Sequence, residues 1–351
     1  MVPILFAPIY KEIIWGGTRL AAQYGRTLPS DTVGESWDVS CRAAEMSVAE
    51  NGAWSGKTLG ELIAADRAGI LGTALCGEES FPLLVKIIDA RDNLSVQVHP
   101  GDAFARVHEN VPFGKTEMWY VLDAPKDAAL IIGLRDSVTE ESFRAAIHNG
   151  AVEDCLGRLP IKRGDVIFIA AGLIHAITAG VMLAEIQQNS DTTYRLYDYN
   201  RLGFDGKPRP LHVEKSIAVT DFRGKLRKTT VPGLSIQRPG ADITYYIACP
   251  YFAFEKIALH GSLQDSTDNE RFLLFMCTEG VAAIQTSDGR LILEAGRTAF
   301  FPASLGAYAL DGTATLLKSY VPNIQRNFMQ PLLDAGYSMA QIAASTAVEG
   351  A

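Results

Sequence analysis

The segment that decides the fold is Gly164-Asp-Val-Ile-Phe-Ile-Ala-Ala-Gly-Leu-Ile-His175. It places a β-branched and aromatic run between two turn glycines, which is typical of a strand followed by a tight turn. The pattern recurs at a constant offset in Gly296-Arg-Thr-Ala-Phe-Phe-Pro-Ala-Ser-Leu-Gly-Ala307, where Phe300 aligns with Phe168 and Ala307 with His175. The repeat indicates two related β-barrels, the second without the histidine; chance similarity of two hairpins is the alternative.

The rest of the chain continues this pattern of short strands. Residues 81–88, 119–122 and 129–132 are further β-branched or aromatic runs bounded by Gly, Pro and Asp. Helix signals are fewer, and they stand at Thr58-x-x-Glu61, at residues 139–148 and at Ser338-x-x-Gln341. We therefore predict a mainly β protein built from two barrels of the jelly-roll type with a few short helices.

The predicted division of the chain follows from the repeat. Residues 1–238 form a metal-binding first domain, which includes a short helical segment at about 136–160. Residues 239–351 form a degenerate second domain in which no Gln-x-His pair occurs between positions 240 and 320.

Composition excludes several classes of partner. The chain has 32 Lys and Arg against 40 Asp and Glu, a net charge of −8, so no cationic surface for nucleic acid or an acidic membrane is expected. The N-terminus lacks the basic region of a signal peptide, and the apolar stretch 171–186 is too short to span a bilayer. Five cysteines without C-x-x-C spacing indicate free thiols and a cytoplasmic location.

Three separate segments offer ligands to one divalent metal. Gln97 and His99 are two residues apart, so on a strand both side chains point to the same face. The same spacing places Lys115 beside Glu117, and His175 adds a second imidazole from a distant strand. Taken singly, either histidine could be an ordinary strand residue satisfied by hydrogen bonds.

This ligand set favours one catalytic zinc per chain. Two imidazoles, a carboxylate and a neutral oxygen leave a coordination position for water or substrate. Nickel, manganese or iron would also accept these ligands.

The glycine and histidine spacing around His175 resembles the second cupin motif, with Ala170 where a proline is usual. Longer segments are similar to the type I mannose-6-phosphate isomerases: Leu94-Ser-Val-Gln-Val-His-Pro-Gly-Asp102, Lys115-Thr-Glu-Met-Trp-Tyr120, Trp15-Gly-Gly17, Gly34-Glu-Ser-Trp37 and Glu185-Ile-Gln-Gln-Asn-Ser-Asp-Thr-Thr-Tyr-Arg195. The resemblance covers about the first 220 residues well. The short interval between Glu117 and His175 matches the compact bacterial form, and Gly114 replaces a histidine of the longer enzymes.

The resemblance implies a role for each matching position. The proposed zinc ligands are Gln97, His99, Glu117 and His175. Arg195 matches the catalytic arginine, and Lys115 is assigned to catalysis beside the metal. The positions expected around the substrate are Ser95, Glu35, Glu185, Asp191 and Arg201.

The implied reaction interconverts mannose 6-phosphate and fructose 6-phosphate through a cis-enediol(ate), and the expected partner is a small sugar phosphate. The metal and Arg195 would stabilise the developing oxyanion. Lys115, a metal-bound water, Glu185 or Asp191 is the candidate base, and Arg201, Ser95 or Arg195 would bind the phosphate.

Three other functions remain open from the sequence, and the first is the isomerisation of another sugar phosphate. An oxidising or decarboxylating metal cupin usually carries His-x-His where this chain has Gln97-x-His99, and an amide is a poor ligand for tuning a redox metal. A sugar-binding cupin without turnover would have no need of Lys115 and Arg195 beside the metal.

Overall fold

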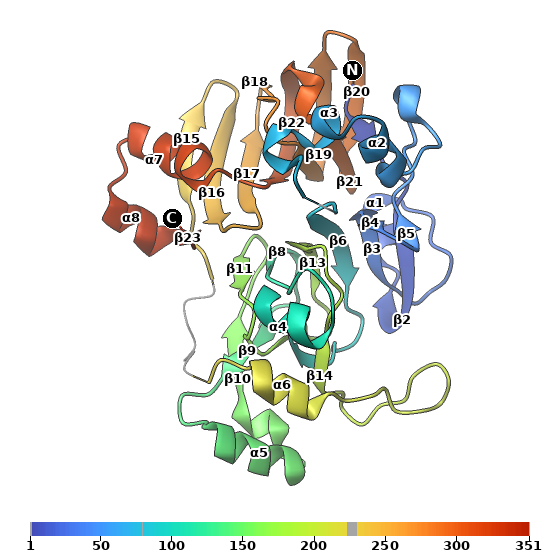
Figure 1. The fold of residues 1–351 in the computed structure, drawn as a ribbon, viewed down its shortest axis with the longest axis vertical. Helices are drawn as coiled ribbons and strands as arrows, with labels where there is room; N and C mark the ends of the chain where they lie inside the picture. The colour runs from blue at the N-terminus through green and yellow to red at the C-terminus, as the bar shows by residue number, and fades with distance from the viewer. Residues whose placement is uncertain (1, 79, 223–229, 351) are drawn as a thin grey trace.

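The computed structural model describes residues 2–78, 80–222 and 230–350, and three sheets dominate its architecture (Figure 1). The six-stranded sheet has the order β11-β8-β13-β6-β3-β2, the five-stranded sheet β10-β9-β12-β7-β14, and the ten-stranded sheet the main path β1-β21-β19-β22-β17-β16-β15. All neighbouring strands on these paths are antiparallel.

The first domain contains the smaller two of these sheets. The six-stranded sheet consists of β2 (Ile9–Gly17), β3 (Val33–Val39), β6 (Leu83–Asp89), β8 (Glu117–Asp123), β11 (Val166–Ile169) and β13 (Met182–Gln188). The five-stranded sheet consists of β7 (Val96–Val98), β9 (Ala129–Leu134), β10 (Leu156–Pro160), β12 (His175–Ala176) and β14 (Tyr194–Tyr197). A separate ribbon pairs β4 (Cys41–Arg42) with β5 (Glu45–Met46).

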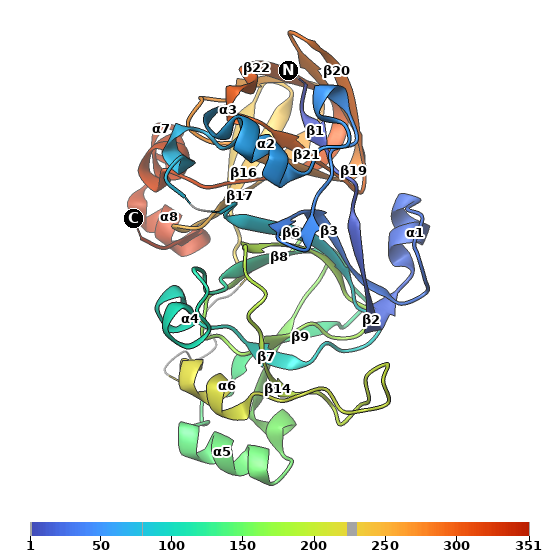
Figure 2. The same ribbon diagram turned by 45° about the vertical axis from the view of Figure 1, so that its right-hand side comes forward.

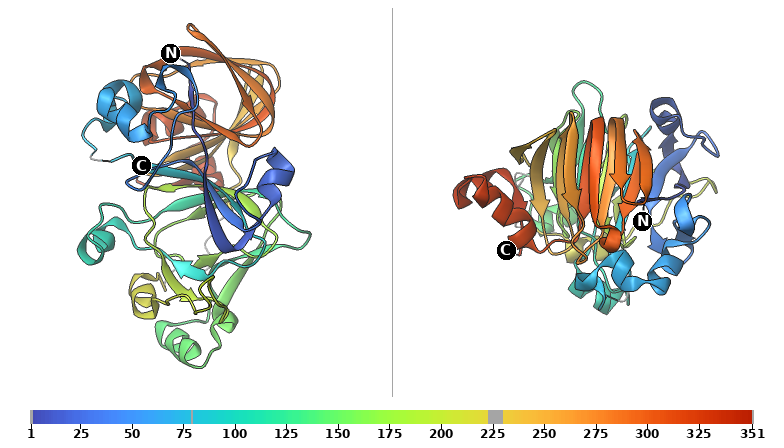
Figure 3. Two further views of the ribbon diagram at one scale, coloured as in Figure 1. Left: turned by 90° about the vertical axis from the view of Figure 1, so that its right-hand side faces the viewer. Right: turned by 90° about the horizontal axis from the view of Figure 1, so that it is seen from above.

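The ten-stranded sheet forms the second domain. Its strands are β1 (Ile4–Leu5), β15 (Leu234–Arg238), β16 (Ala241–Ala248), β17 (Ala253–Leu259), β18 (Ser262–Ser266), β19 (Leu273–Thr286), β20 (Gly289–Glu294), β21 (Arg297–Phe301), β22 (Ala307–Tyr320) and β23 (Ala347–Val348). Figure 3 shows these strands side by side, with the C-terminal helices at one edge and the N-terminal residues at the other.

The six-stranded sheet lies in the middle of the molecule, and both of its faces are covered (Figure 2). One face meets the five-stranded sheet across an apolar core that includes Trp119, Ile132 and Ile167. The other face packs against the ten-stranded sheet, where Met118 and Phe254 belong to one continuous apolar cluster. Alternation of side chains along each strand directs successive residues into these two different cores.

Short helices cover the remaining faces. Helices α5 (Glu140–His148) and α6 (Val213–Val219) lie on the outer face of the five-stranded sheet, where Phe143 is fully buried. The others are α1 (Arg19–Tyr24), α2 (Leu59–Ala65), α3 (Arg67–Leu71), α4 (Asp102–His108), α7 (Gln330–Asp334) and α8 (Met339–Ser345). No helix in the described ranges has the length and apolar character needed to cross a membrane.

The structure confirms the mainly β prediction and the three helix signals. Thr58 and Ser338 each form a capping box at the start of α2 and α8. The apolar stretch after Thr58 is nevertheless two helices, because Asp66 ends α2 and its side chain caps α3 at Gly69.

Three segments differ from the prediction: one in its secondary structure, and two in the domain to which they belong. The helical segment predicted at about 136–160 was too long at its end, because Leu156–Pro160 pairs with β9 as strand β10 after a short 3₁₀ helix, Val152–Cys155. Leu234–Arg238 was expected in the first domain but pairs with β16, and Ile4–Leu5 pairs with β21. The ten-stranded sheet therefore recruits strands from both sides of the predicted boundary.

The internal repeat occupies matching places in the two domains. Ile167 of β11 is the cross-strand partner of Trp119, and its repeat equivalent Ala299 of β21 is the partner of Phe275. The strand order β11-β8-β13-β6-β3-β2 of the first domain therefore corresponds to β21-β19-β22-β17-β16-β15 of the second. This correspondence supports a common origin for the two hairpins over chance similarity.

Candidate metal centre and active-site cavity

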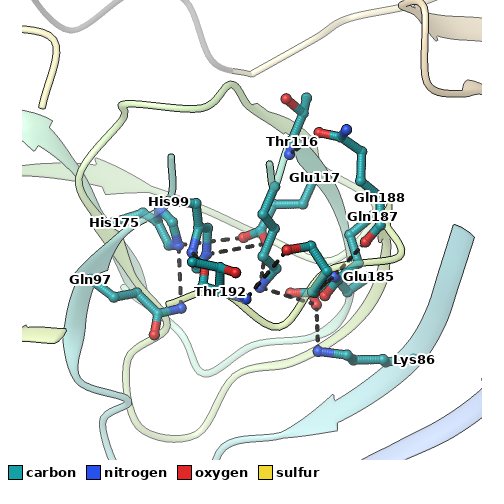
Figure 4. Close-up of polar contacts among 12 residues, drawn as sticks. Lys86, Gln97, His99, Thr116, Glu117, His175, Glu185, Gln187, Gln188 and Thr192 are labelled. Atoms are coloured by element: carbon teal, nitrogen blue, oxygen red, sulfur yellow. Dashed lines mark hydrogen bonds and ion pairs between the residues drawn. The ribbon is translucent and has the colours of Figure 1, made fainter. Parts of the chain in front are cut away.

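The proposed metal ligands come from the two facing sheets of the first domain. Gln97 lies in β7 and His175 begins β12, and the two are direct cross-strand partners. His99 lies one residue beyond the end of β7, while Glu117 begins β8 on the opposite sheet. The fold thus brings four residues from three segments to one place, as Figure 4 shows.

The two imidazoles and the carboxylate are close enough to bind one ion. His99 Nε2 lies 3.5 Å from Glu117 Oε2, and His175 Nε2 lies 3.4 Å from Glu117 Oε1. One ligand atom from each of the three residues falls within 4.8 Å of the others, and all three side chains are buried. Among the described residues this is the one such group found.

Both imidazoles are held so that their Nε2 atoms face the centre. His99 Nδ1 is 3.0 Å from the Thr192 carbonyl oxygen, and His175 Nδ1 is 2.8 Å from the Leu173 carbonyl oxygen. Carbonyl acceptors require Nδ1 to carry the proton, which leaves a lone pair on Nε2. His99 Nε2 is buried without a hydrogen-bond partner among the described residues, which is expected of an atom arranged to bind a metal.

Gln97 reaches the same centre from the side of His175. Its Nε2 is 3.3 Å from His175 Nε2, and rotating the amide by half a turn puts the carbonyl oxygen there instead. The residues present therefore fit a divalent metal with two nitrogen and two oxygen ligands.

Burial sets the charge state of the ligands. Removal from water lowers the pKa of His175 to about 4 and lowers the pKa of His99 well below its usual value, with Lys115 acting in the same direction on both. Both imidazoles are therefore neutral at pH 7, the form that binds metals. Burial and the charge of Glu185 raise the pKa of Glu117, so the cations around this carboxylate are needed to keep it ionised.

A buried network of charges adjoins the metal ligands. Lys115 Nζ lies 2.8 Å from Glu117 Oε2 and 4.0 Å from Glu185 Oε1. Lys86 Nζ lies 3.1 Å from the same Glu185 oxygen, and Trp119 Nε1 donates to the other at 2.9 Å. Burial raises the pKa of Glu185, but Lys86 and Lys115 outweigh it, so the net shift is downward and the carboxylate is ionised.

This network forms the floor of a cavity of about 260 Å³ between the two sheets. Its lining contains the sequence-predicted residues Ser95, Gln97, Lys115, Glu35, Glu185, Asp191 and Arg195. Arg201 is not in the lining, and its guanidinium pairs with Asp198 at 2.8 Å. His99, Glu117 and His175 lie fully buried beside the cavity.

Arg195 lies on the cavity wall beside the metal centre. It is the cross-strand partner of Gln97, so the two side chains start from adjacent positions on strands β14 and β7. Its Nη1 donates to the Pro210 carbonyl oxygen at 3.0 Å, and its buried Nε has no hydrogen-bond partner in the described part of the chain.

Two charged lining residues, Arg209 and Lys86, were not predicted from the sequence. Arg209 is carried by the loop that follows β14 and pairs with Asp198 at 2.6 Å, next to Arg195. Lys86 and Trp37 face the cavity from strands β6 and β3 of the six-stranded sheet. A lysine between apolar residues in an otherwise buried strand was the available signal for Lys86, since an unpaired charge is rarely buried.

Close backbone packing explains the glycine at position 114, and the sequence alone did not predict this packing. A Cβ at this position would lie 2.4 Å from the Pro100 carbonyl oxygen and 2.7 Å from the Asp102 amide nitrogen. The chain crosses its neighbour too closely here for any side chain, so the histidine of the longer enzymes has no room in this backbone.

The two-domain β fold defines a cupin, and its buried His-Glu-His group beside a polar cavity has the ligand atoms that a metal ion requires. Residues 4–145 match the family described as phosphomannose isomerase type I, catalytic domain, and residues 242–321 match the mannose-6-phosphate isomerase cupin domain. The chain belongs to the type I mannose-6-phosphate isomerases.

Similar proteins span almost the whole chain. Mannose-6-phosphate isomerase ManA of Bacillus subtilis is 40% identical over 321 residues, which cover 91% of this chain and 99% of the relative. The mannose-6-phosphate isomerase of Streptococcus mutans is 37% identical, covering 91% and 98%. The crystal structure of mannose 6-phosphate isomerase from Bacillus subtilis superposes with a TM-score of 0.84 at 34% identity, covering 91% and 99%.

Proposed function

We propose that the protein is a zinc-dependent aldose-ketose isomerase that interconverts mannose 6-phosphate and fructose 6-phosphate through a cis-enediol(ate). The observation that carries this proposal is the buried group His99, Glu117 and His175 beside a cavity that also holds Lys115 and Arg195. The activity named for the relatives supports the same substrate pair.

The proposed zinc would be held by Gln97, His99, Glu117 and His175. When bound, it supplies positive charge that polarises the substrate oxygens on C1 and C2. An amide in place of a second strand histidine favours zinc, which needs no redox tuning, over iron or manganese. The five cysteines are unpaired, which is consistent with a reducing cytoplasm as the place of the reaction.

Proton transfer between C1 and C2 is assigned to Lys115. Its amine lies on the cavity wall between a metal ligand and Glu185. In its neutral form it takes the proton from one of the two carbons, and the ammonium that results returns the proton to the other carbon. Glu185 is a poorer base, because Lys86 and Lys115 lower its pKa and Trp119 donates to its second oxygen. Glu185 then acts as a positioning residue that holds Lys115 in place.

Arg195 is assigned to the negative charge of the enediolate, because its strand position is opposite the metal ligand Gln97. The phosphate is assigned to Arg209 on the adjoining wall, with Ser95 as a hydroxyl donor. Arg201 supports this end of the cavity indirectly, because it shares Asp198 with Arg209.

One coupled assay tests the proposal. Formation of fructose 6-phosphate from mannose 6-phosphate is followed before and after a chelator, and again after zinc is restored. The proposal expects activity that the chelator removes and zinc restores. Full activity in the chelated, metal-free protein would overturn the metal dependence, and binding of the sugar phosphate without turnover would favour a sugar-binding cupin.

A further inference from the structure

The second domain contains a polar cavity at the position that the active-site cavity occupies in the first. In the first domain Lys86 of β6 is the cross-strand partner of Glu185 of β13, which also faces Trp119. In the second domain Glu255 of β17 is the partner of Lys318 of β22, which also faces Phe275. Since Phe275 and Trp119 are equivalent in the repeat, the two charged pairs are equivalent as well.

The charges of the pair are exchanged between the domains. The position of Lys86 on β6 is occupied by Glu255 on β17. The position of Glu185 on β13 is occupied by Lys318 on β22. The Lys318 Nζ to Glu255 Oε2 distance is 3.4 Å. Trp37, the partner of Lys86, is replaced by Tyr245, the partner of Glu255, so an aromatic side chain lines each cavity.

The equivalents of the proposed metal ligands Glu117 and His175 are missing from this second cavity. Glu117 is the cross-strand partner of Ile169. The repeat equivalent of Ile169 is Phe301, whose cross-strand partner is Leu273. Leu273 therefore occupies the position of Glu117. His175 is replaced by Ala307 in the repeat. The second domain has therefore kept a polar cavity while losing metal chemistry.

The cavity has a volume of about 160 Å³ and contains buried groups without hydrogen-bond partners. Glu255 is 1% exposed; the Tyr320 hydroxyl donates to its Oε1, while its Oε2 has the ion pair with Lys318 but accepts no hydrogen bond in the described ranges. Arg271 is 4% exposed, and its Nε is likewise unpartnered there. Such groups are costly to bury, so their retention in an enzyme domain indicates a ligand.

We propose that this cavity is a second, non-catalytic binding site for a small neutral polyhydroxylated molecule, namely a monosaccharide or the corresponding alditol. A sugar hydroxyl can donate to Glu255 while accepting from Lys318, and each sugar carries several such groups. The ring of Tyr245 offers an apolar wall for the carbon-bound hydrogens of the sugar.

Charge argues against a phosphorylated ligand here. The lining contains two cations, Arg271 and Lys318, against three carboxylates, Glu255, Asp265 and Asp268. Arg271 is already paired with Asp268 at 3.3 Å, and it also holds Glu270 at 2.8 Å. A phosphate dianion would be repelled by the excess of carboxylates. An uncharged sugar can donate hydrogen bonds to the carboxylates and accept them from the cations.

Ligand-observed NMR titration with D-mannose and D-mannitol tests the proposal on the metal-loaded protein. Mannitol has no carbonyl group, so it cannot be isomerised. We expect saturable binding that Glu255→Gln and Lys318→Met each weaken by about tenfold or more, the cost of leaving one buried polar partner unpaired. The control Glu279→Gln, which removes a surface ion pair with Arg163, should bind as the wild type does.

Isomerase kinetics test whether the second cavity is independent of the active-site cavity. The kcat and KM for mannose 6-phosphate should be unchanged in all three variants, and inorganic phosphate should not displace mannitol. If Glu255→Gln lowers the melting temperature so far that it cannot be titrated, Tyr245→Ala serves in its place. Absence of saturable binding to the wild type, or binding that none of the cavity variants weakens, would overturn the proposal.

Discussion

The Arg195→Lys variant keeps a positive charge beside the proposed metal centre but removes the planar guanidinium group, so it tests which of the two catalysis requires. The arginine uses Nη1 for the Pro210 carbonyl oxygen at 3.0 Å and its Nε is buried, which leaves Nη2 for the substrate side. Lysine carries its donors on a single nitrogen, so it lacks the planar fork with which arginine reaches the loop carbonyl and the enediolate from separate nitrogens. We expect kcat to fall by about a hundredfold or more, equivalent to about 2.7 kcal/mol of transition-state stabilisation, as when an oxyanion donor is removed.

The same change should have little effect on stability. Arg195 makes no ion pair within 4.0 Å among the described residues, and its hydrogen bond to Pro210 is worth about 1 kcal/mol. Steady-state kinetics, the melting temperature and metal content are measured together, with Arg163→Lys, a surface arginine paired with Glu279, as the control. A raised KM with unchanged kcat would place Arg195 on the phosphate, and wild-type kinetics would refute its assigned role.

Three further predictions concern the surroundings of the metal centre. Lys86→Met leaves Glu185 buried with one cation fewer, so its pKa should rise and the free energy of unfolding at pH 7 should fall by about 3 kcal/mol; an unchanged denaturation midpoint would contradict this. His175 has a folded-state pKa of about 4 against 6.5 when exposed, so the metal-free protein should lose up to about 3 kcal/mol of stability as the pH falls from 6.5 to 4. Thermal melts of the chelated protein between pH 6.5 and pH 4 measure the direction of this change in stability. A melting temperature that rises toward pH 4 would contradict the prediction. Gly114→Ala forces a Cβ against the Pro100 carbonyl oxygen, so it should destabilise the protein by about 2 kcal/mol or more and lower kcat by displacing Lys115; a variant with wild-type melting and kinetics would show that the backbone adapts.

Motif spacing was sufficient to predict that His99, Glu117 and His175 lie together, because short segments of regular strand have only one geometry; their role as metal ligands stays a prediction. Gln97 and His99 share a face although the strand itself ends at Val98. The pairing of Gln97 with His175, by contrast, follows from sheet order and register, which the sequence of either strand alone does not specify.

Arg201 and Arg209 show where the sequence was insufficient. Both arginines follow β14, and both pair with Asp198, but only Arg209 lines the cavity. The path of an irregular loop decides this difference, and loop conformation depends on tertiary contacts that periodicity does not encode. The roles of these residues stay predictions until they are tested.

The domain boundary was uncertain for a related reason. Strands β1 and β15 lie at opposite edges of the ten-stranded sheet, and an edge strand needs only one neighbour. Their short apolar runs are compatible with either domain, so the partner sheet determines where they belong.

Metal content of the wild type and of His99→Ala tests the central claim most directly. Removing one imidazole leaves Glu117 and His175 with Gln97, a set that should bind zinc far more weakly. We predict one zinc per chain in the active wild type, and loss of both the metal and fructose 6-phosphate formation in a variant that remains folded. Stoichiometric metal with full activity in His99→Ala would contradict the account.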